Sequence, residues 1–592
     1  MGGGHAGVEA ALAAARLGAR VTLVTLDARA VGRMSCNPAI GGLAKGQLAR
    51  EIDALGGLMG EAADHAAQQY RMLNTRKGPA VQSPRAQVDK ERYAAFVRER
   101  VAHTPGVELL EGQVRAVRER AGRLTALELT DGSQLHPDAA VLTTGTFLRG
   151  LMHVGDKVSA GGRVGEAPAQ ELSASLSALG LELLRLKTGT PPRVDARSVD
   201  LSGLEAVDAP PGDQGFSFRV PVPAERASVA SHVTHTHEAL HELVRVNLHL
   251  SPYGRGALEG TGPRYCPSLE DKVARFPDKL SHRLFVERET RDGHSLYLNG
   301  LSTCLPLDVQ RELVRGLEGF ADARLLRPGY AVEYDALPAW QLRPSLECRA
   351  VNGLFLAGQI NGTSGYEEAA AQGLMAGLNA VRACRGEAAA VLGRHEAYVG
   401  VLIDDLVTSS PREPYRMFTS RAEFRLSLRQ DNADRRLAPR AAEWGLIHES
   451  FAASVADKEA RLASAQRALG HDDAPLRREL RRGAELDEDF ARRAGLHELL
   501  RDADERFQLQ LDVSYAGYIA RQARTVARRD ELAAERLPED LDYAAISGLK
   551  TEAREVLARV RPVDLAQASR LAGVTQADLA LLMLSRRGPA RA

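Results

Sequence analysis

The chain begins with a glycine fingerprint, Gly2-Gly-Gly-His-Ala-Gly7, which fits the pattern G-x-G-x-x-G. A helical pattern over residues 8–17 and a β-branched run over residues 20–25 follow it. Glycines at these places allow a tight turn, a close approach of backbone N–H groups to a pyrophosphate, and close packing of the helix on a sheet. The pattern predicts a doubly wound α/β domain that binds a nucleotide through Gly2, Gly3, Gly4, His5, Ala6 and Gly7.

A second glycine motif stands far downstream, where Ala357-Gly-Gln359, Gly362 and Gly365 lead into a helical stretch over residues 366–377. A helix N-terminus facing a flavin ring would favour the anionic reduced flavin, and the paired motifs indicate FAD rather than NAD. The fingerprint normally follows a strand, whereas only Met1 precedes it here, so we expect the natural start to lie upstream.

The length of 592 residues predicts two or three domains. Strand signals return at residues 139–144 and 353–358, residues 201–340 are richer in Pro, His and aromatic residues, and strand signals fade from residue 398 onward. A stretch at residues 484–500 has helical periodicity. We therefore predict an FAD-binding Rossmann-type domain (1–200 and 341–397), an inserted α/β domain (201–340), and an all-helical C-terminal domain (398–592).

Charge and cysteine content exclude several classes of protein. The 77 Lys and Arg residues balance 77 Asp and Glu residues, so nucleic acid would have to bind to a local basic surface. The five cysteines form no C-x-x-C pair, which argues against a disulfide framework, a cysteine-built zinc site and a disulfide reductase. No run of about eighteen apolar residues and no signal peptide occur, so we expect a soluble, cytoplasmic protein without a membrane partner.

Several longer motifs resemble those of one family, the glucose-inhibited division protein A family. The motifs span residues 32–42 (GRMSCNPAIGG), 186–193 (LKTGTPPR), 262–273 (GPRYCPSLEDKV), 357–363 (AGQINGT), 413–425 (EPYRMFTSRAEFR) and 515–522 (YAGYIARQ). They follow one another over nearly the whole chain.

The resemblance implies an FAD-dependent enzyme that uses NADH and methylenetetrahydrofolate, with glycine or ammonium, to modify C5 of a tRNA wobble uridine. It implies a homodimer and a partner GTPase subunit in a heterotetramer, which we place with part of the tRNA on the helical domain. It implies that Gln359 and the backbone near Val114 contact FAD. For a nicotinamide site it implies Gly262, Pro263, Arg264, Tyr265, Glu270, Lys272 and Phe276.

Uracil C5 is a poor nucleophile until a group adds to C6, and a thiolate suits this task because it attacks and leaves readily. Cys266 is the first candidate, since Arg264 and Lys272 lie near it in sequence and Glu270 and Asp271 offer proton transfer. Cys36 is the second candidate. We interpret the remaining cysteines as small buried hydrophobic residues: Cys304, Cys348 and Cys384.

Basic residues suggest where RNA binds. Arg421, Arg425 and Arg429 recur at i, i+4 and i+8, which would place them on one face of a helix, and Arg436 lies beyond. The alternative is a solvated face whose arginines pair with neighbouring carboxylates. The segment from Lys187 to Arg193 is stiffened by two prolines and suits either an anion site or a structural turn.

The segment His237-Glu-Ala-Leu-His241 fits the zinc-protease pattern H-E-x-x-H, but the extended form would need a histidine where Asn247 stands. We therefore predict no metal. Two alternative functions remain: a folate- and FAD-dependent tRNA uridine-54 methyltransferase, which should lack the helical domain, and a flavin-bearing RNA-binding protein without catalysis.

Overall fold

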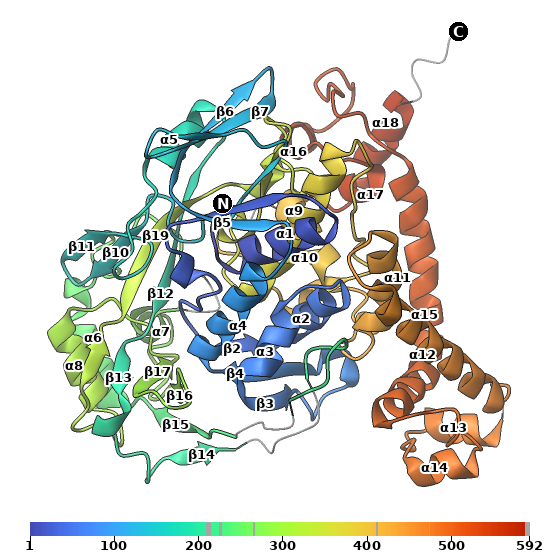
Figure 1. Cartoon of the computed structure of the whole chain (residues 1–592), viewed down its shortest axis with the longest axis horizontal. Coiled ribbons are helices and arrows are strands. Elements are labelled where there is room, and N and C mark those ends of the chain that lie inside the picture. The colour runs from blue at the N-terminus through green and yellow to red at the C-terminus, as the bar shows by residue number, and fades with distance from the viewer. Residues whose placement is uncertain (209–214, 224–227, 264–266, 410–412, 473, 587–592) are drawn as a thin grey trace.

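The computed structural model describes residues 1–208, 215–223, 228–263, 267–409, 413–472 and 474–586. Figure 1 shows an α/β body with an inserted lobe on one side and an arm of helices on the other. The predicted fold class is confirmed, because parallel strands and helices form the body, a second sheet forms the lobe, and helices alone form the arm.

Two parallel strand pairs form the centre of the body. They are β1 (Val21–Thr25) with β5 (Val107–Glu111), and β9 (Ala140–Leu142) with β20 (Leu354–Leu356). All four strands are short, and β9 and β20 consist of apolar residues, as expected for parallel strands covered on both faces. Strand β5 is largely exposed. The strands predicted at residues 20–25, 139–144 and 353–358 are thereby confirmed.

Met1 and Gly2 lie between these two pairs. The Gly2 N–H donates to the Val24 carbonyl at 2.7 Å, and the Thr143 N–H donates to the Met1 carbonyl at 2.9 Å. The Met1 amino group donates to the Val141 carbonyl at 2.8 Å, and its burial lowers the pKa of this group to about 5. The fingerprint therefore starts inside the layer that β1 and β9 border.

Helices α1 (His5–Arg16) and α9 (Tyr366–Cys384) pack closely against each other. A Cβ on Gly373 would lie 2.0 Å from the Ala6 carbonyl oxygen, and one on Gly377 would lie 2.3 Å from that of Ala10. Any side chain at these two glycines would push the helices apart. The packing brings together two glycine motifs that lie far apart in the sequence, at residues 2–7 and 357–365.

The rest of the body packs on the same apolar core. Its helices are α2 (Lys45–Ala54), α3 (Met59–Ala66), α4 (Lys90–Ala102) and α5 (Glu171–Ala178). Its further strands are β2 (Ala39–Gly41), β3 (Ala67–Leu73), β4 (Ser83–Val88), β6 (Val114–Arg120), β7 (Arg123–Leu129) and β8 (Gln134–Leu135).

The inserted lobe has its own apolar core, which includes residues from Val194 to Ala323. Its six-stranded sheet has the order β14 (Glu205–Val207), β15 (Ser231–His235), β16 (Arg283–Arg288), β17 (Ser295–Asn299), β13 (Arg193–Asp195), β18 (Leu325–Arg327). Its helices are α6 (Glu238–Val246), α7 (Leu269–Arg275) and α8 (Leu307–Arg315).

A four-stranded sheet carries the chain into and out of this lobe. Its order is β11 (Lys157–Ala160), β10 (Leu151–Val154), β19 (Tyr330–Ala336), β12 (Leu184–Thr190). Strand β12 is followed directly by β13, and β18 is followed directly by β19. The lobe therefore begins and ends on neighbouring antiparallel strands, next to the body.

The C-terminal helices divide among three cores. Helices α10 (Tyr398–Ser409) and α11 (Ala433–Glu443) pack on the body, and two smaller cores lie farther along the arm. The longest helix, α15 (Ala503–Ala534), connects these two cores (Figure 1). The others are α12 (Glu449–Ala468), α13 (Pro475–Arg481), α14 (Glu488–Arg493), α16 (Thr551–Val560), α17 (Leu565–Ala568) and α18 (Gln576–Arg586).

The helical pattern predicted over residues 484–500 holds only in part. The structure has helix only over Glu488–Arg493, because Gly495 ends it with a φ of +67°. A positive φ is easy for glycine and stops helix propagation. Among the described helices, none is both long enough and apolar enough to cross a membrane.

Candidate cofactor and thiol site

The N-terminus of α1 is open to an anion. Gly4 is the N-cap residue, and no side chain among the described residues caps this helix. No heavy atom would lie within 4 Å of a Cβ on Gly4, so a ligand can approach the backbone closely there. Unpaired backbone N–H groups at a helix N-terminus favour phosphate. This geometry suits the pyrophosphate of a dinucleotide.

Gly7 fixes the shape of this turn. A Cβ on Gly7 would lie 1.8 Å from the carbonyl oxygen of Gly2, closer than any side-chain atom can approach. The first turn of α1 can therefore fold back on the fingerprint only with glycine at this position.

Two further predicted contacts border the same edge of the central strands. Gln359 follows β20 in a short helical turn, η6 (Gly358–Asn361), and a Cβ on Gly358 would lie 3.2 Å from the Ala6 Cβ. Val114 begins β6 just after Gly112, whose N–H donates to the last residue of β1. Ligands of such sheets bind at the carboxyl ends of the strands, where Gln359 and Val114 stand.

His5 links this edge to the loop that carries Cys36, called the cysteine loop below. Its ring stacks on that of Tyr366 with centroids 4.6 Å apart, and its buried Nε2 atom has no hydrogen-bond partner among the described residues. Burial, with help from Arg163, lowers the pKa of His5 to about 4, so the imidazole is neutral at pH 7. A neutral imidazole with a free ring nitrogen can donate or accept one hydrogen bond from a bound cofactor.

Tyr366 holds the backbone of the cysteine loop. The Cys36 N–H donates to the Tyr366 hydroxyl oxygen at 2.7 Å. Burial, and the nearby Cys36, raise the pKa of the Tyr366 hydroxyl well above its ordinary value. A neutral hydroxyl that stands at the first residue of α9 therefore ties the loop to the second glycine motif.

The Cys36 thiol, half-buried, faces the inserted lobe. Its Sγ atom lies 2.9 Å from the Tyr297 hydroxyl and 3.9 Å from both the Gly189 carbonyl and the Thr190 hydroxyl. Arg193 donates to the carbonyl of Ser35 at 3.2 Å and so fixes the residue before the thiol. The motifs over residues 32–42 and 186–193 are thus joined in one site.

Two cations and one carboxylate lie beside this thiol. Lys90 and Arg193 bind the same Glu289 oxygen, at 2.5 Å and 3.2 Å. Burial alone would raise the pKa of Glu289, but the two cations lower it to about 2. The trio carries a net charge of +1, and both cations lie within electrostatic range of Cys36.

Of the two interpretations of the segment from Lys187 to Arg193, the structure favours a structural role for Arg193. Its guanidinium is occupied by the Pro191 carbonyl, the Thr190 hydroxyl and Glu289. Lys187 instead lies beside Gly262: a Cβ on Gly262 would be 2.5 Å from the Lys187 Cε. Strand β12 thus runs past both the Gly262 segment and Cys36.

The predicted nicotinamide residues that the structure describes differ in their surroundings. Glu270 is fully buried and accepts hydrogen bonds from the Cys304 N–H at 2.9 Å and the Thr303 hydroxyl at 3.1 Å. This placement argues against a direct contact of Glu270 with a nicotinamide. Lys272 donates to the Gly300 carbonyl at 2.7 Å, while Phe276 is exposed. Three predicted residues lie outside the described ones: Arg264, Tyr265 and Cys266.

Asp271, predicted to move protons, is bonded on both sides. It accepts from the Tyr253 hydroxyl at 2.8 Å and pairs with Arg275 at 2.8 Å. Cys304, beside the Glu270 carboxylate, is buried, and burial raises the pKa of its thiol to about 12. Cys304 is therefore a buried thiol, as predicted, whereas Cys384 is exposed and departs from that interpretation.

The predicted arginine stripe is wrong as a single helical face. Residues 422–432 form turns, and α11 begins only at Ala433. Arg429 is 1% exposed and binds Asp431 at 3.1 Å. Arg436 pairs with Glu51 at 2.9 Å. These two arginines fasten the arm to the body and cannot reach RNA in this conformation, whereas Arg425 is exposed.

The two histidines of the H-E-x-x-H match have structural partners. His237 bonds to the Gly316 carbonyl at 3.0 Å, and His241 to the Thr236 hydroxyl at 2.7 Å. Within the ranges that the structure describes, no group of three or more His, Cys, Asp or Glu residues is placed to hold a metal ion.

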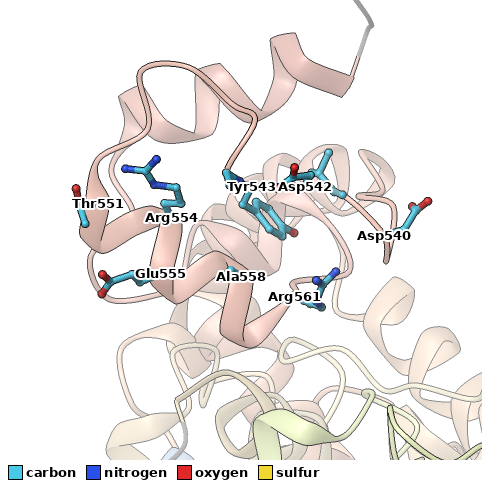
Figure 2. A pocket seen from close by; sticks show the side chains of 10 residues that line it. Asp540, Asp542, Tyr543, Thr551, Arg554, Glu555, Ala558 and Arg561 are labelled. Atoms are coloured by element: carbon cyan, nitrogen blue, oxygen red, sulfur yellow. Dashed lines mark hydrogen bonds between the residues drawn. The ribbon is translucent and has the colours of Figure 1, made fainter.

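A hollow of about 490 Å³ opens in the C-terminal helical bundle (Figure 2). Side chains of both signs line it, among them Asp542, Glu555, Arg554 and Arg561. All its lining residues come from positions 540–561, so none belongs to the glycine motifs or the cysteine loop. It is a local feature of the arm, separate from the thiol site.

Sequence reasoning missed the residues that surround the thiol. Tyr297 stands in an ordinary alternating strand, and Lys90 begins α4, so no local pattern marks either residue. Tyr366 does carry a signal, because it opens the helix after the second glycine motif.

Two family models match the chain. One, described as glucose inhibited division protein A, matches residues 1–388, and the other, described as the tRNA modifying enzyme MnmG/GidA C-terminal helical bundle, matches residues 523–591.

Individual relatives match over nearly the full length. The tRNA uridine 5-carboxymethylaminomethyl modification enzyme MnmG of Rhodopirellula baltica is 48% identical, with 98% of this chain and 92% of the relative covered. The protein of the same name from Chlorobaculum tepidum is 45% identical, with coverages of 99% and 98%. The solved form II structure of Aquifex aeolicus GidA has a TM-score of 0.92 and 40% identity, covering 99% of this chain and 98% of that one.

Proposed function

The chain belongs to the glucose-inhibited division protein A family, and on that premise we propose that it is an FAD-dependent enzyme that modifies C5 of a tRNA wobble uridine. The group added would be carboxymethylaminomethyl or aminomethyl, made from methylenetetrahydrofolate and glycine or ammonium, with NADH as reductant. The observation that carries the proposal is the position of Cys36, where the nucleotide fingerprint, the β12 motif and the inserted lobe meet.

A thiolate would start the chemistry on the uracil ring. Its sulfur bonds to C6, and the C5–C6 π electrons form an enolate whose C5 attacks the one-carbon unit. Loss of the C5 proton then expels the thiolate and restores the ring. The bond from the methylene carbon to the folate nitrogen breaks, tetrahydrofolate leaves, and the amine of glycine or ammonium bonds to that carbon and loses a proton. Cys36 and Cys266 are the two candidates for this thiolate, and the positive cluster of Lys90 and Arg193 supports Cys36.

The fingerprint would hold the FAD. The backbone N–H groups of the first turn of α1 would bind the pyrophosphate, and the free nitrogen of neutral His5 would donate or accept one further hydrogen bond. The backbone at Val114 would lie near the adenine, and Gln359 near the flavin or its ribityl chain. When bound, the flavin supplies the redox step between NADH and the one-carbon unit.

The nicotinamide site is proposed on the segment that begins at Gly262. Glu270 is left out of the proposed contacts because it is buried and bonded to Thr303 and Cys304. The proposed residues of the site are Gly262, Pro263, Arg264, Tyr265, Lys272 and Phe276. The contact of Gly262 with Lys187 supports this location, since Lys187 stands two residues before Gly189, which borders the Cys36 thiol.

The tRNA would bind along exposed arginines of the arm. Arg425 is exposed and Arg421 is half-exposed, stacked 4.4 Å above the Tyr415 ring. On α15 no acidic residue occurs between Asp512 and Asp530, while that stretch carries several exposed arginines: Arg521, Arg524 and Arg528. Arginines spaced three and four residues apart share one helix face and suit a phosphate backbone.

The partners of this reaction are proposed from the family. A homodimer would bind a partner GTPase in a heterotetramer, and the helical arm would carry the contact. Because tRNA, NADH and folate meet in the cytoplasm, we place the reaction there.

The test is mass analysis of wobble nucleosides in tRNA from cells that lack this gene. The cells are complemented with the unchanged gene, Cys36→Ser, Cys266→Ser or, as a matched control, Cys384→Ser, which changes an exposed thiol at the far end of α9. The proposal expects the unchanged gene and Cys384→Ser to restore the modified uridine, and at least one of the other two variants to fail.

Two results would overturn the proposal. If wobble uridines are unchanged while uridine 54 loses its methyl group, the chain is the methyltransferase instead. If Cys36→Ser and Cys266→Ser both restore full modification, thiolate catalysis by these residues is wrong.

A further inference from the structure

Among the described residues, the Cys36 thiol has one close polar neighbour, and that neighbour comes from the inserted lobe. The Tyr297 hydroxyl lies 2.9 Å from Sγ, although the two residues are 261 positions apart. Tyr297 stands in β17 and is 3% exposed, so the lobe sheet holds its ring firmly. The other oxygens near Sγ, from Gly189 and Thr190, lie 3.9 Å away, at the outer limit for a hydrogen bond to sulfur.

Cations flank the Tyr297 ring. The Arg193 guanidinium lies 4.8 Å and the Lys90 ammonium 5.5 Å from the ring centroid. Glu289 binds both cations and leaves the cluster with one positive charge in excess. Tyr366, the hydroxyl on the other side of the loop, accepts from the Cys36 backbone.

The positive charge around the Cys36 thiol and the Tyr297 hydroxyl bears on which of the two donates the hydrogen bond. Positive charge stabilises an anion at either the thiol or the phenol, but a free cysteine loses its proton at a pH about 1.5 units lower than a tyrosine does. In a pair of one thiol and one phenol that shares a single negative charge, the sulfur carries the charge and the phenol is the donor. A hydroxyl that donates to a thiolate stabilises the charged form and lowers the pKa of the thiol.

We propose that Tyr297 is a positioning residue for Cys36: its hydroxyl donates to the thiolate, promotes ionisation, and aims the sulfur. Because the hydroxyl belongs to the inserted lobe, it can reach the sulfur only when the lobe is docked on the body. This inference rests on the proposed role of Cys36 in the chemistry, but the ionisation of Cys36 can be measured without tRNA.

The test is the pH dependence of Cys36 alkylation by iodoacetamide in the full-length protein, followed on the Cys36 peptide by mass spectrometry. Tyr297→Phe removes only the hydroxyl. Hydrogen bonds to charged groups have strengths that correspond to about one to two pH units. The midpoint for Cys36 should rise by that amount, and alkylation at neutral pH should slow about tenfold or more, while the exposed Cys384 in the same digest is unchanged.

Tyr253→Phe is the matched control, because it removes a hydroxyl of the same lobe that binds Asp271 rather than a thiol. Lys90→Gln is a second variant that leaves the phenol in place, and it should move the midpoint in the same direction by a smaller amount. Circular dichroism of each variant reports whether the fold is intact.

An unchanged Cys36 midpoint in Tyr297→Phe would overturn the inference, whatever Lys90→Gln does. An equal shift in Tyr253→Phe would also overturn it, since general loosening of the lobe would then explain the effect. Failure of the proposed function looks different: Cys36→Ser would leave wobble uridines modified, while the alkylation profile of Tyr297→Phe would still be shifted.

Discussion

Arg429 offers a direct test of how the arm is attached to the body. Its guanidinium has no exposed side-chain surface, binds Asp431 through Nε at 3.1 Å, and donates to the Leu426 carbonyl at 3.1 Å. Asp512 of α15 lies 3.5 Å from it. Arg429→Ala removes the cation and leaves Asp431, itself 7% exposed, without its partner.

The size of the effect follows from this burial. Breaking a buried ion pair by deleting one partner costs about 3–5 kcal/mol, because the remaining charge stays desolvated. For a unit of about 150–250 residues, such as the helical domain over residues 398–592, about 1 kcal/mol corresponds to a shift of about 2–4 °C. The apparent Tm of that domain should therefore fall by about 10 °C. Arg425→Ala, which deletes an exposed arginine four residues earlier, should change the stability by less than about 0.5 kcal/mol.

Thermal unfolding and tRNA binding, measured on both variants, separate the two roles. We expect Arg429→Ala to lose stability and Arg425→Ala to lose tRNA affinity. If Arg429→Ala kept the Tm of the unchanged protein and lost as much tRNA affinity as Arg425→Ala, the structural role of the buried arginine would be refuted and the stripe predicted from sequence restored.

Three further predictions follow from the geometry. Gly7→Ala should weaken FAD binding about tenfold or more in a fluorescence titration, because its Cβ would lie 1.8 Å from a backbone oxygen. Gly517→Ala is the control and should leave FAD binding unchanged, because its Cβ would have no heavy atom within 4 Å. The pKa of Glu289 is about 2 in the folded protein, against an ordinary value of 4.5. Its ionised carboxylate should therefore stabilise the protein by about 3 kcal/mol above pH 4.5. That contribution should be lost as the pH falls from 4.5 to 2, and Glu289→Gln should flatten this part of the pH–stability curve. Replacing Arg524 and Arg528 by Gln should lower the slope of log tRNA affinity against log salt by about 1.5, and an unchanged slope would contradict their contact with phosphate.

The parts of the fold that the sequence predicted are those set by local pattern. The fingerprint, its helix and the strands at residues 20–25, 139–144 and 353–358 depend on glycine placement and on short apolar runs, and they appear in the structure. The sequence alone did not explain Gly373 and Gly377; the contact of α1 with α9 shows that no side chain fits at these positions.

The residues around the thiol could not be predicted, because each belongs to a different segment. Tyr297 and Tyr366 reach Cys36 over separations of 261 and 330 residues, and no periodicity encodes a contact of that range. Arg429 was misplaced for the opposite reason: its spacing from Arg425 fits a helix, but the chain turns at residues 422–432 and buries the guanidinium.

The neighbours of the Cys36 thiol are synthesised at different times, because they come from distant parts of the chain. Cys36 leaves the ribosome 330 residues before Tyr366, the residue that fixes its backbone. At typical synthesis rates of about 5–20 residues per second, roughly 20–60 seconds pass between the two. Tyr297 follows Cys36 by 261 residues, so the hydroxyl of the lobe is made before the anchor of α9. The neighbours that would activate the thiol are therefore complete only when the lobe and the second glycine motif have both been made.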